Sequence, residues 1–132
     1  MSDKLLNDAL LTSIKEHLEF AGYTVDLSED EKPRLRAKHA LKSNLWIRRF
    51  RGGVLFSAFY LSSEAGKSKR DELLRLVNIM NEASGISHCY ADKPGDLIIE
   101  GWYPGTYNRQ DFAVFLDNFN EDVSMGLMPA VN

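Results

Sequence analysis

The chain has 132 residues, of which 44% are hydrophobic and 27% charged, and these values fit one globular domain spanning residues 1–132. The net charge of −3 argues against a protein whose whole surface binds polyanions, although a local basic patch is compatible with it. A single cysteine excludes an intrachain disulfide framework and fits a reducing compartment. Because the N-terminus lacks a signal-peptide pattern and no apolar run reaches the length of a bilayer span (about 18 residues), we expect a cytoplasmic protein that does not bind membranes.

The first expected element is an amphipathic helix within residues 4–21. Apolar side chains recur there at three- and four-residue spacing and share one face, namely Leu6, Leu10, Ile14, Leu18 and Ala21. Asp3 is the expected N-cap, and Gly22 suits the left-handed residue that ends a helix. A short alternating run over residues 23–27 then leads into a charged loop at residues 28–33.

Three strands are expected next. "RLRAKH" alternates strictly, with Arg34, Arg36 and Lys38 on one face and Leu35, Ala37 and His39 on the other, which is typical of a half-buried strand. "NLWIRRF" and "VLFSAFYL" are the second and third strands, and Gly52-Gly53 between them predicts a two-residue hairpin turn. "VLFSAFYL" is apolar on both faces, so it is either a central strand covered on both sides or a strand whose second face contacts a partner.

A second helix is expected within residues 67–84, followed by two strands. Its apolar stripe consists of Leu73, Leu76, Val77 and Met80. Ser68 and Asp71 resemble a capping box at its start, and Gly85 is expected to close it. The strands "ISHCYAD" and "DLIIEGWY" are joined by a turn at residues 93–95.

The last expected element is a helix over residues 108–127, capped by Thr106 or Asn108 and ended by Gly126 and Pro129. Its buried stripe consists of Phe112, Phe115, Leu116, Phe119 and Val123. Four acidic side chains of this helix are expected toward solvent, namely Asp111, Asp117, Glu121 and Asp122.

These elements predict an α+β fold with the order α-β-β-β-α-β-β-α. The strand connections are mostly tight hairpins, so we expect a mostly antiparallel sheet of about five strands. Three amphipathic helices need a surface to cover, and we expect them to pack on this sheet.

Catalytic and cofactor chemistry finds little support in the sequence. Gly66-Lys67-Ser68 resembles the end of a phosphate-binding loop, but the first glycine of that motif would fall at position 61, which is Leu61. Cys89 and the adjacent His88 point to opposite faces of a strand and cannot form a dyad with each other. The three histidines are isolated and do not have the spacing of metal ligands. We therefore expect no enzyme, no cofactor and no metal.

The charge distribution is the most informative local feature. Residues 32–63 contain eight basic and no acidic residues, whereas residues 110–132 contain four acidic and no basic ones. Trp46 and Phe50 interleave with the positive charges. Three interpretations stay open: a solvated face that resists edge aggregation, a site for an acidic protein, or a site for single-stranded nucleic acid. The candidate protein-binding residues are Arg34, Arg36, Lys38, Trp46, Arg48 and Phe59.

The succession of elements resembles the YbjN-like family, within the type III secretion chaperone-like fold. The resemblance rests on four stretches: "VLFSAFYL", "LLRLVNIMNEAS" with Asn78 and Asn81 three residues apart, "DLIIEGWY" and "YNRQDFAVFLDNFNEDVSM". It implies a small homodimer that holds other polypeptides or acts as an adaptor, with a twofold contact at about residues 68–91 and no catalytic residues to transfer.

Together, these observations predict a non-enzymatic protein-binding module. We expect a chaperone-like or regulatory adaptor that acts as a small cytoplasmic homodimer on another protein. The alternative is a nucleic-acid-binding regulator that uses the basic strands 34–51, which the negative net charge disfavours.

Overall fold

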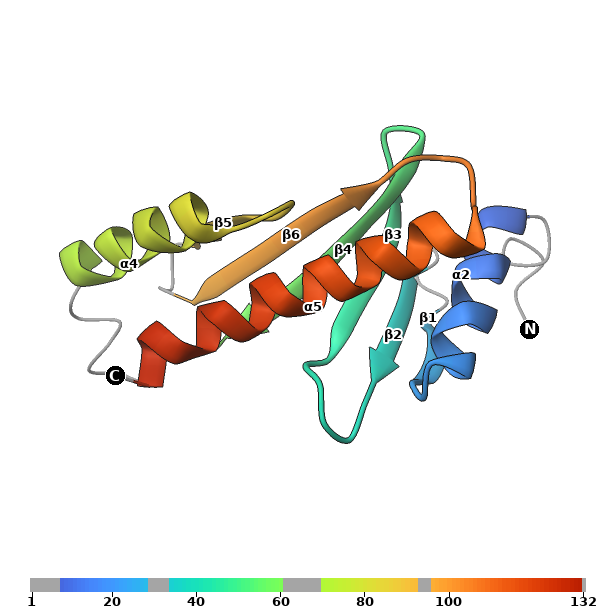
Figure 1. Cartoon of the computed structure of the whole chain (residues 1–132), viewed down its shortest axis with the longest axis horizontal. Coiled ribbons are helices and arrows are strands. Elements are labelled where there is room, and N and C mark those ends of the chain that lie inside the picture. Colours follow the sequence, from blue (N-terminus) through green and yellow to red (C-terminus); the bar gives the residue numbers. More distant parts are fainter. Residues whose placement is uncertain (1–7, 29–33, 61–69, 93–95, 132) are drawn as a thin grey trace.

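The computed structural model describes residues 8–28, 34–60, 70–92 and 96–131 (Figure 1). Within these residues, the elements in chain order are α2 (Ala9–Phe20), β1 (Thr24–Ser28), β2 (Arg34–Lys38), β3 (Leu45–Phe50), β4 (Gly53–Tyr60), α4 (Arg70–Ala83), β5 (His88–Ala91), β6 (Leu97–Tyr103) and α5 (Arg109–Val131). None of these helices combines the length and the apolarity that a bilayer span requires. The Gly66-Lys67-Ser68 stretch, the proposed capping box at Ser68 and the turn at residues 93–95 lie outside the described residues.

The strands form one antiparallel sheet in the order β1-β2-β3-β4-β6-β5. The predicted α+β class is confirmed. The described sheet has six strands rather than about five, because residues 24–28, which show only a short alternation in the sequence, pair with β2 along their whole length. The observed order is therefore α-β-β-β-β-α-β-β-α.

All three described helices pack on one face of the sheet. Figure 1 shows α5 running along the sheet, α2 next to β1 and α4 next to β5. Phe56 of β4 lies at the centre of the core, and its ring contacts Phe112 and Phe119 of α5 at centroid distances of 5.7 and 6.1 Å. Ile14 of α2 and Met80 of α4 belong to the same buried cluster.

The ends of α2 are set by two local signals. Asp8 is its N-cap, and the Asp8 carboxylate accepts a hydrogen bond from the Leu11 N–H at 3.0 Å. The predicted cap, Asp3, lies outside the described residues. Gly22 has a φ of 97°, as predicted, and the Tyr23 N–H donates to the Leu18 carbonyl at 3.0 Å, which completes a Schellman-type end.

The β3–β4 turn differs by one residue from the prediction. Its two central residues are Arg51 and Gly52, with φ values of 50° and 78°, which are typical of a type I′ turn. Gly53 instead pairs with Phe50 as the first residue of β4. A Cβ at Gly53 would collide with the backbone of Tyr103 and the neighbouring indole, so glycine is needed there for close approach of β6.

Helix α5 confirms most of its predicted stripe, since Phe112, Leu116, Phe119 and Val123 are buried and Phe115 is half-buried. Asn108 is the observed cap, because its side chain accepts a hydrogen bond from the Asp111 N–H at 3.0 Å. The predicted end was wrong: the helix continues through Gly126 and Pro129 to Val131. Proline removes one backbone donor but has a helical φ, so it weakens a helix without forbidding it.

One acidic residue of α5 was also misplaced. Asp111, Asp117 and Glu121 are exposed, as expected, but Asp122 is only 6% exposed. Its carboxylate accepts hydrogen bonds from three backbone N–H groups in the connection between α4 and β5. These bonds offset the free-energy cost of burying the charge.

Candidate functional site

The face of the sheet opposite the helices carries every second residue of its strands, and we call it the open face. The register places these side chains on it: Asp26, Arg34, Arg36, Lys38, Trp46, Arg48, Phe50, Leu55, Ser57, Phe59, His88, Tyr90, Ile98, Glu100 and Trp102. All six predicted protein-binding residues are among them. Within the described part of the chain, no helix covers this face.

The position of strand β4 in the sheet explains why its sequence is apolar on both faces. Val54, Phe56 and Ala58 are fully buried under the helices. On the open face, Leu55 is only 4% exposed although no helix lies over it, while Phe59 is 43% exposed. The strand is therefore central, between β3 and β6, and in the part of the chain that the structure describes its second face is covered by neighbouring side chains of the sheet.

The β2–β3 part of the open face is cationic. Arg34 lies directly opposite Arg48 in the β2–β3 register, and Arg36 lies opposite Trp46. Like charges directly opposite each other in a sheet are destabilising. Among the residues that the structure describes, the four cations of this face make no ion pair, whereas Arg49, which points to the helix side, lies 3.4 Å from the Asp8 carboxylate.

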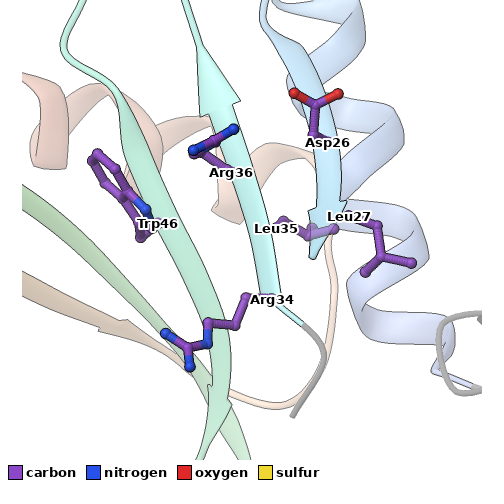
Figure 2. Close-up of a pocket in the computed structure, with 6 residues that line it drawn as sticks. All are labelled: Asp26, Leu27, Arg34, Leu35, Arg36 and Trp46. Atoms are coloured by element: carbon purple, nitrogen blue, oxygen red, sulfur yellow. The ribbon is translucent and has the colours of Figure 1, made fainter. Parts of the chain in front are cut away.

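A hollow of about 330 Å³ lies at this cationic part. It is lined by Asp26, Leu27, Arg34, Leu35, Arg36 and Trp46. Figure 2 shows Arg34 reaching from β2 across β3, on the same side of the sheet as the Trp46 indole. A cationic hollow with an aromatic wall suits a carboxylate or phosphate attached to a flat or apolar group.

The middle of the open face is apolar and aromatic. Trp46 and Phe59 meet edge to face, with ring centroids 5.0 Å apart. Leu55 and Ile98 are nearly buried beneath their neighbours. Trp102 is 46% exposed, and its indole N–H donates to the Phe50 carbonyl at 2.8 Å, which fixes the ring over the β3–β4 turn.

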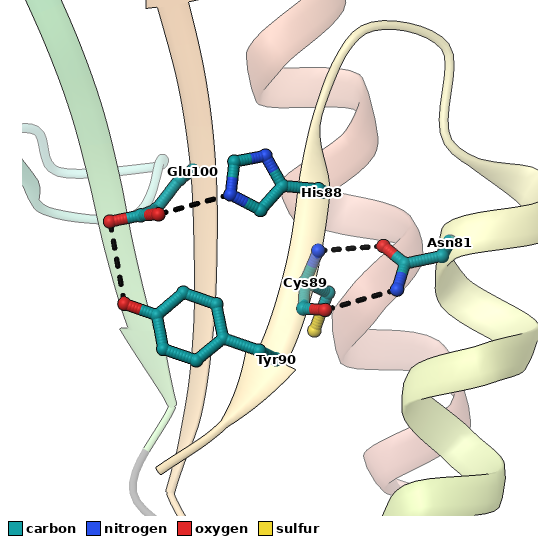
Figure 3. Close-up of polar contacts among 5 residues, drawn as sticks. All are labelled: Asn81, His88, Cys89, Tyr90 and Glu100. Atoms are coloured by element: carbon teal, nitrogen blue, oxygen red, sulfur yellow. Dashed lines mark hydrogen bonds and ion pairs between the residues drawn. The ribbon is translucent and has the colours of Figure 1, made fainter.

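The β5–β6 part of the open face carries a carboxylate held by two neighbours (Figure 3). The Glu100 carboxylate lies 3.0 Å from His88 Nε2 and accepts a hydrogen bond from the Tyr90 hydroxyl at 3.4 Å. Burial and the nearby Glu100 charge both raise the pKa of Tyr90. The two ends of the open face therefore have opposite charge character.

The outer edge of β5 is closed by a side chain of α4. The Asn81 amide accepts a hydrogen bond from the Cys89 N–H at 2.6 Å and donates one to the Cys89 carbonyl at 3.0 Å (Figure 3). These two bonds imitate those of a neighbouring strand. Asn81 belongs to the Asn-x-x-Asn spacing seen in the sequence, but spacing alone did not reveal its contact with a strand edge.

The predicted separation of Cys89 from His88 is confirmed. Cys89 is buried on the helix side, where its sulfur lies 4.0 Å from that of Met80, whereas His88 is on the open face. Burial raises the pKa of the Cys89 thiol to about 11, so the thiol is protonated near neutral pH and is a poor nucleophile. Among the described residues, no group of three His, Cys, Asp or Glu side chains could hold a metal ion.

Several residues of the open face were not singled out from the sequence, notably Leu55, Ile98, Glu100 and Trp102. The alternation in "DLIIEGWY" does place Ile98, Glu100 and Trp102 on one face. The sequence does not show which strand lies next to these residues, since β6 pairs with β4 across a long stretch of intervening chain.

Comparisons with known proteins give a family and a fold. Over residues 10–126 the sequence matches the model of the YbjN family, described as "Putative bacterial sensory transduction regulator". No curated protein matches the chain in sequence.

Three solved structures illustrate the similarity of fold. The crystal structure of YbjN from E. coli, described as "a putative transcription regulator", has a TM-score of 0.69 at 17% identity and covers 91% of this chain and 90% of that one. An uncharacterized protein from Methanothermobacter thermautotrophicus has a TM-score of 0.69 at 11% identity, over 90% and 94% of the two chains. One chain of the heterodimeric ExoU-SpcU complex, from the type III secretion system of Pseudomonas aeruginosa, has a TM-score of 0.59 at 20% identity, over 85% and 93%.

Proposed function

This chain belongs to the YbjN family, and we propose that it is a non-catalytic module that binds a segment of another protein on the open face of its sheet. The resemblance noted in the sequence is thereby confirmed, including the likeness of fold to a chain of a secretion-system complex. That related fold occurs in a heterodimeric complex, which supports a protein as the class of partner. We further propose a regulatory or chaperone-like adaptor that acts in the cytoplasm.

A single observation carries this proposal: among the described residues, the helices cover one face of the sheet, and the other face combines exposed aromatic rings with arginines that make no ion pair. Trp46, Phe59 and Trp102 stand on this face beside Arg34 and Arg48. Tryptophan and arginine are enriched at the energetic centres of protein interfaces. Burial of the apolar area of this face against a partner would stabilise the complex.

The tryptophans provide a direct test. Trp46 and Trp102 are the only two in the sequence, and both lie on the open face. Intrinsic fluorescence therefore reports occupancy of this face without any label. We expect saturable spectral changes when synthetic peptides of varied composition are titrated in, and we expect Trp46→Phe and Trp102→Phe each to lose part of the signal. If no peptide in a broad panel changes the fluorescence, the proposal is wrong.

The second candidate function is single-stranded nucleic acid binding by strands 34–51. It is favoured by Trp46 and by the four cations of the β2–β3 part, which make no ion pair with described residues. Two contacts weaken it, because the Phe50 ring is already covered by the guanidinium groups of Arg48 and Arg51, at 4.9 and 5.3 Å, and the Trp46 ring packs against Phe59. Binding of an oligothymidine that weakens steeply with salt would favour this candidate over a protein partner.

We also propose that the chain is a homodimer that pairs through the region of α4 and β5, within residues 68–91. Three apolar side chains of this region are exposed, which supports a contact there: Leu74, Ile79 and Ile86. Sedimentation at tens of micromolar should give the mass of a dimer. Ile79→Glu should shift it to a monomer, and the control Val114→Glu, which places a charge at an equally exposed site on α5, should not. A monomer for the unmodified chain would contradict this proposal.

A further inference from the structure

We propose that the open face recognises a two-part segment, with carboxylates at one end and an aromatic or aliphatic side chain at the other. The carboxylates bind the arginines of β2 and β3, and the apolar side chain binds over β4 and β6. This inference rests on the proposed function and specifies the chemistry of the partner. It is argued from the arrangement of charge and apolar area across the strands.

Among the described residues, the cationic end has more positive than negative side chains. Arg34 and Arg48 lie opposite each other on adjacent strands, and Arg36 is diagonal to Arg48 in the same register. Asp26, opposite Arg36, is the carboxylate that the register places beside this group. A carboxylate from a partner would relieve the repulsion between the guanidinium groups and could accept two hydrogen bonds from one of them.

The apolar end has a buried floor flanked by exposed rings. Leu55 pairs with Trp102, and Phe59 pairs with Ile98, and the pair of Ser57 and Glu100 lies between them, so each ring stands beside one aliphatic side chain. Leu55 and Ile98 are 4% and 8% exposed, whereas the two rings are more than 40% exposed. An incoming apolar side chain can contact either ring without displacing the aliphatic side chain beside it.

The spacing of the strands sets the spacing of the segment. Neighbouring strands lie about 4.8 Å apart, so the middle of β2–β3 and the middle of β4–β6 are separated by roughly 10 Å. An extended peptide advances about 3.3 Å per residue. A segment that crosses the strands therefore needs its acidic group about three residues from its apolar anchor.

Glu100 sets the direction of this segment. It lies on β6 between Ile98 and Trp102, where it is held by His88 and Tyr90. A ligand carboxylate placed over β6 would be repelled by Glu100, whereas one over β2–β3 would be attracted by the arginines. The positive charge of the arginines disfavours a second copy of this chain stacked through its cationic part, since arginines would then face arginines.

The test uses peptides of about twelve residues, long enough to cross the sheet, followed by tryptophan fluorescence. The parent peptide contains two glutamates and one phenylalanine about three residues apart in a Gly/Ser background. Three variants replace the glutamates with lysines, replace the phenylalanine with alanine, or move the two groups about nine residues apart. We expect each variant to bind roughly tenfold more weakly than the parent, or worse.

A charge exchange in the protein gives the sharper result. The double variant Arg34→Glu/Arg48→Glu should no longer bind the glutamate peptide and should bind the lysine peptide instead. Arg75→Glu makes a matched control, because Arg75 is an exposed cation on α4, on the helix side of the sheet. The thermal midpoints of all variants show whether folding is intact, and we expect small changes, because the arginines make no described ion pair and Arg48 loses its stacking on Phe50.

The outcomes separate the two proposals. If peptides bind but the parent and its variants bind equally, the two-part recognition is overturned and the proposed function stands. If no peptide binds, both are overturned. If an oligothymidine binds and displaces the parent peptide, and the lysine peptide is not gained by the double variant, the open face is a nucleic-acid site and the inference is wrong.

Discussion

Asp122 of α5 accepts a hydrogen bond from the Gly85 N–H at 2.9 Å, across 37 positions of sequence. Its second carboxylate oxygen accepts from Ile86 and Ser87, at 3.1 and 3.0 Å. One side chain thus satisfies three successive backbone donors in the α4–β5 connection. This contact ties the last helix to the segment that begins the β5–β6 part of the open face.

Removing this carboxylate should destabilise the protein markedly. We expect Asp122→Ala to lower the free energy of unfolding by about 2–4 kcal/mol, because three partly buried N–H groups lose a charged acceptor. Asp117→Ala, on the exposed side of the same helix, should cost less than about 0.5 kcal/mol. Urea unfolding of both variants tests the contrast, and equal effects would show that the carboxylate contributes nothing specific.

The aromatic residues of the α5 stripe should differ in how much they contribute to the free energy of unfolding. Phe119 is fully buried, and its ring packs over Gly101 of β6, where any Cβ would lie 2.8 Å from it. We expect Phe119→Ala to cost about 3–5 kcal/mol. Phe115 contacts the Phe56 and Tyr103 rings, at 5.1 and 5.3 Å, but is half-buried, so Phe115→Ala should cost about half as much. If the order is reversed in chemical unfolding, the assignment of the core is wrong.

The same Phe115→Ala variant also separates core from binding surface. If the stripe were the docking site for a partner, the substitution would weaken peptide binding and leave the thermal midpoint nearly unchanged. We expect the opposite, a lower midpoint with unchanged affinity per folded molecule.

The sequence was sufficient to place the predicted binding residues of each strand on one face of that strand, because alternation is a local property. Arg34, Arg36 and Lys38 had to share a face once residues 34–38 formed a strand, and the same holds for Trp46 and Arg48. The joining of β2, β3 and β4 through short connections then brought these residues together.

The remainder of the open face depended on long-range pairing that no local pattern encodes. β6 inserts between β4 and β5, and only this brings Trp102 beside Leu55 and Glu100 beside Ser57. The burial of Asp122 likewise depends on where a distant loop lies, so an acidic residue on a helix was reasonably but wrongly assigned to solvent. The turn at Arg51 was missed because a non-glycine residue there adopts a positive φ.

Stability should fall as the solution is acidified through the range in which histidine titrates. Burial, followed by the nearby Arg109 charge, lowers the pKa of His17 below 6.5, while Asp117 acts in the opposite direction. The unfolded chain therefore binds a proton on His17 before the folded chain does, and the free energy of unfolding decreases as the pH falls through about 6.5. The decrease should level off below the folded pKa.

His17→Gln isolates this contribution. His17 Nδ1 lies 2.8 Å from the Tyr107 hydroxyl, and glutamine retains a polar group that can reach the same position. Urea unfolding from about pH 5 to pH 8 should show a shallower slope for the variant than for the parent protein. A parent protein that becomes more stable on acidification relative to this variant would contradict the lowered pKa.

The two asparagines of α4 should differ sharply in their contribution, although they are only three residues apart. Both are exposed, but Asn81 makes two hydrogen bonds to the backbone of Cys89, whereas Asn78 makes none with the described residues. We expect Asn81→Ala to cost about 1–3 kcal/mol of unfolding free energy, because two backbone groups of an edge strand lose their partner, and Asn78→Ala to cost less than about 0.5 kcal/mol. Hydrogen exchange adds a local readout, since the Cys89 N–H should exchange faster in Asn81→Ala than in Asn78→Ala. If the Cys89 N–H is equally protected in both variants, the edge of β5 is covered by something other than the Asn81 amide. A second copy of the chain would then be the first candidate, because the proposed pairing region of the homodimer includes this edge.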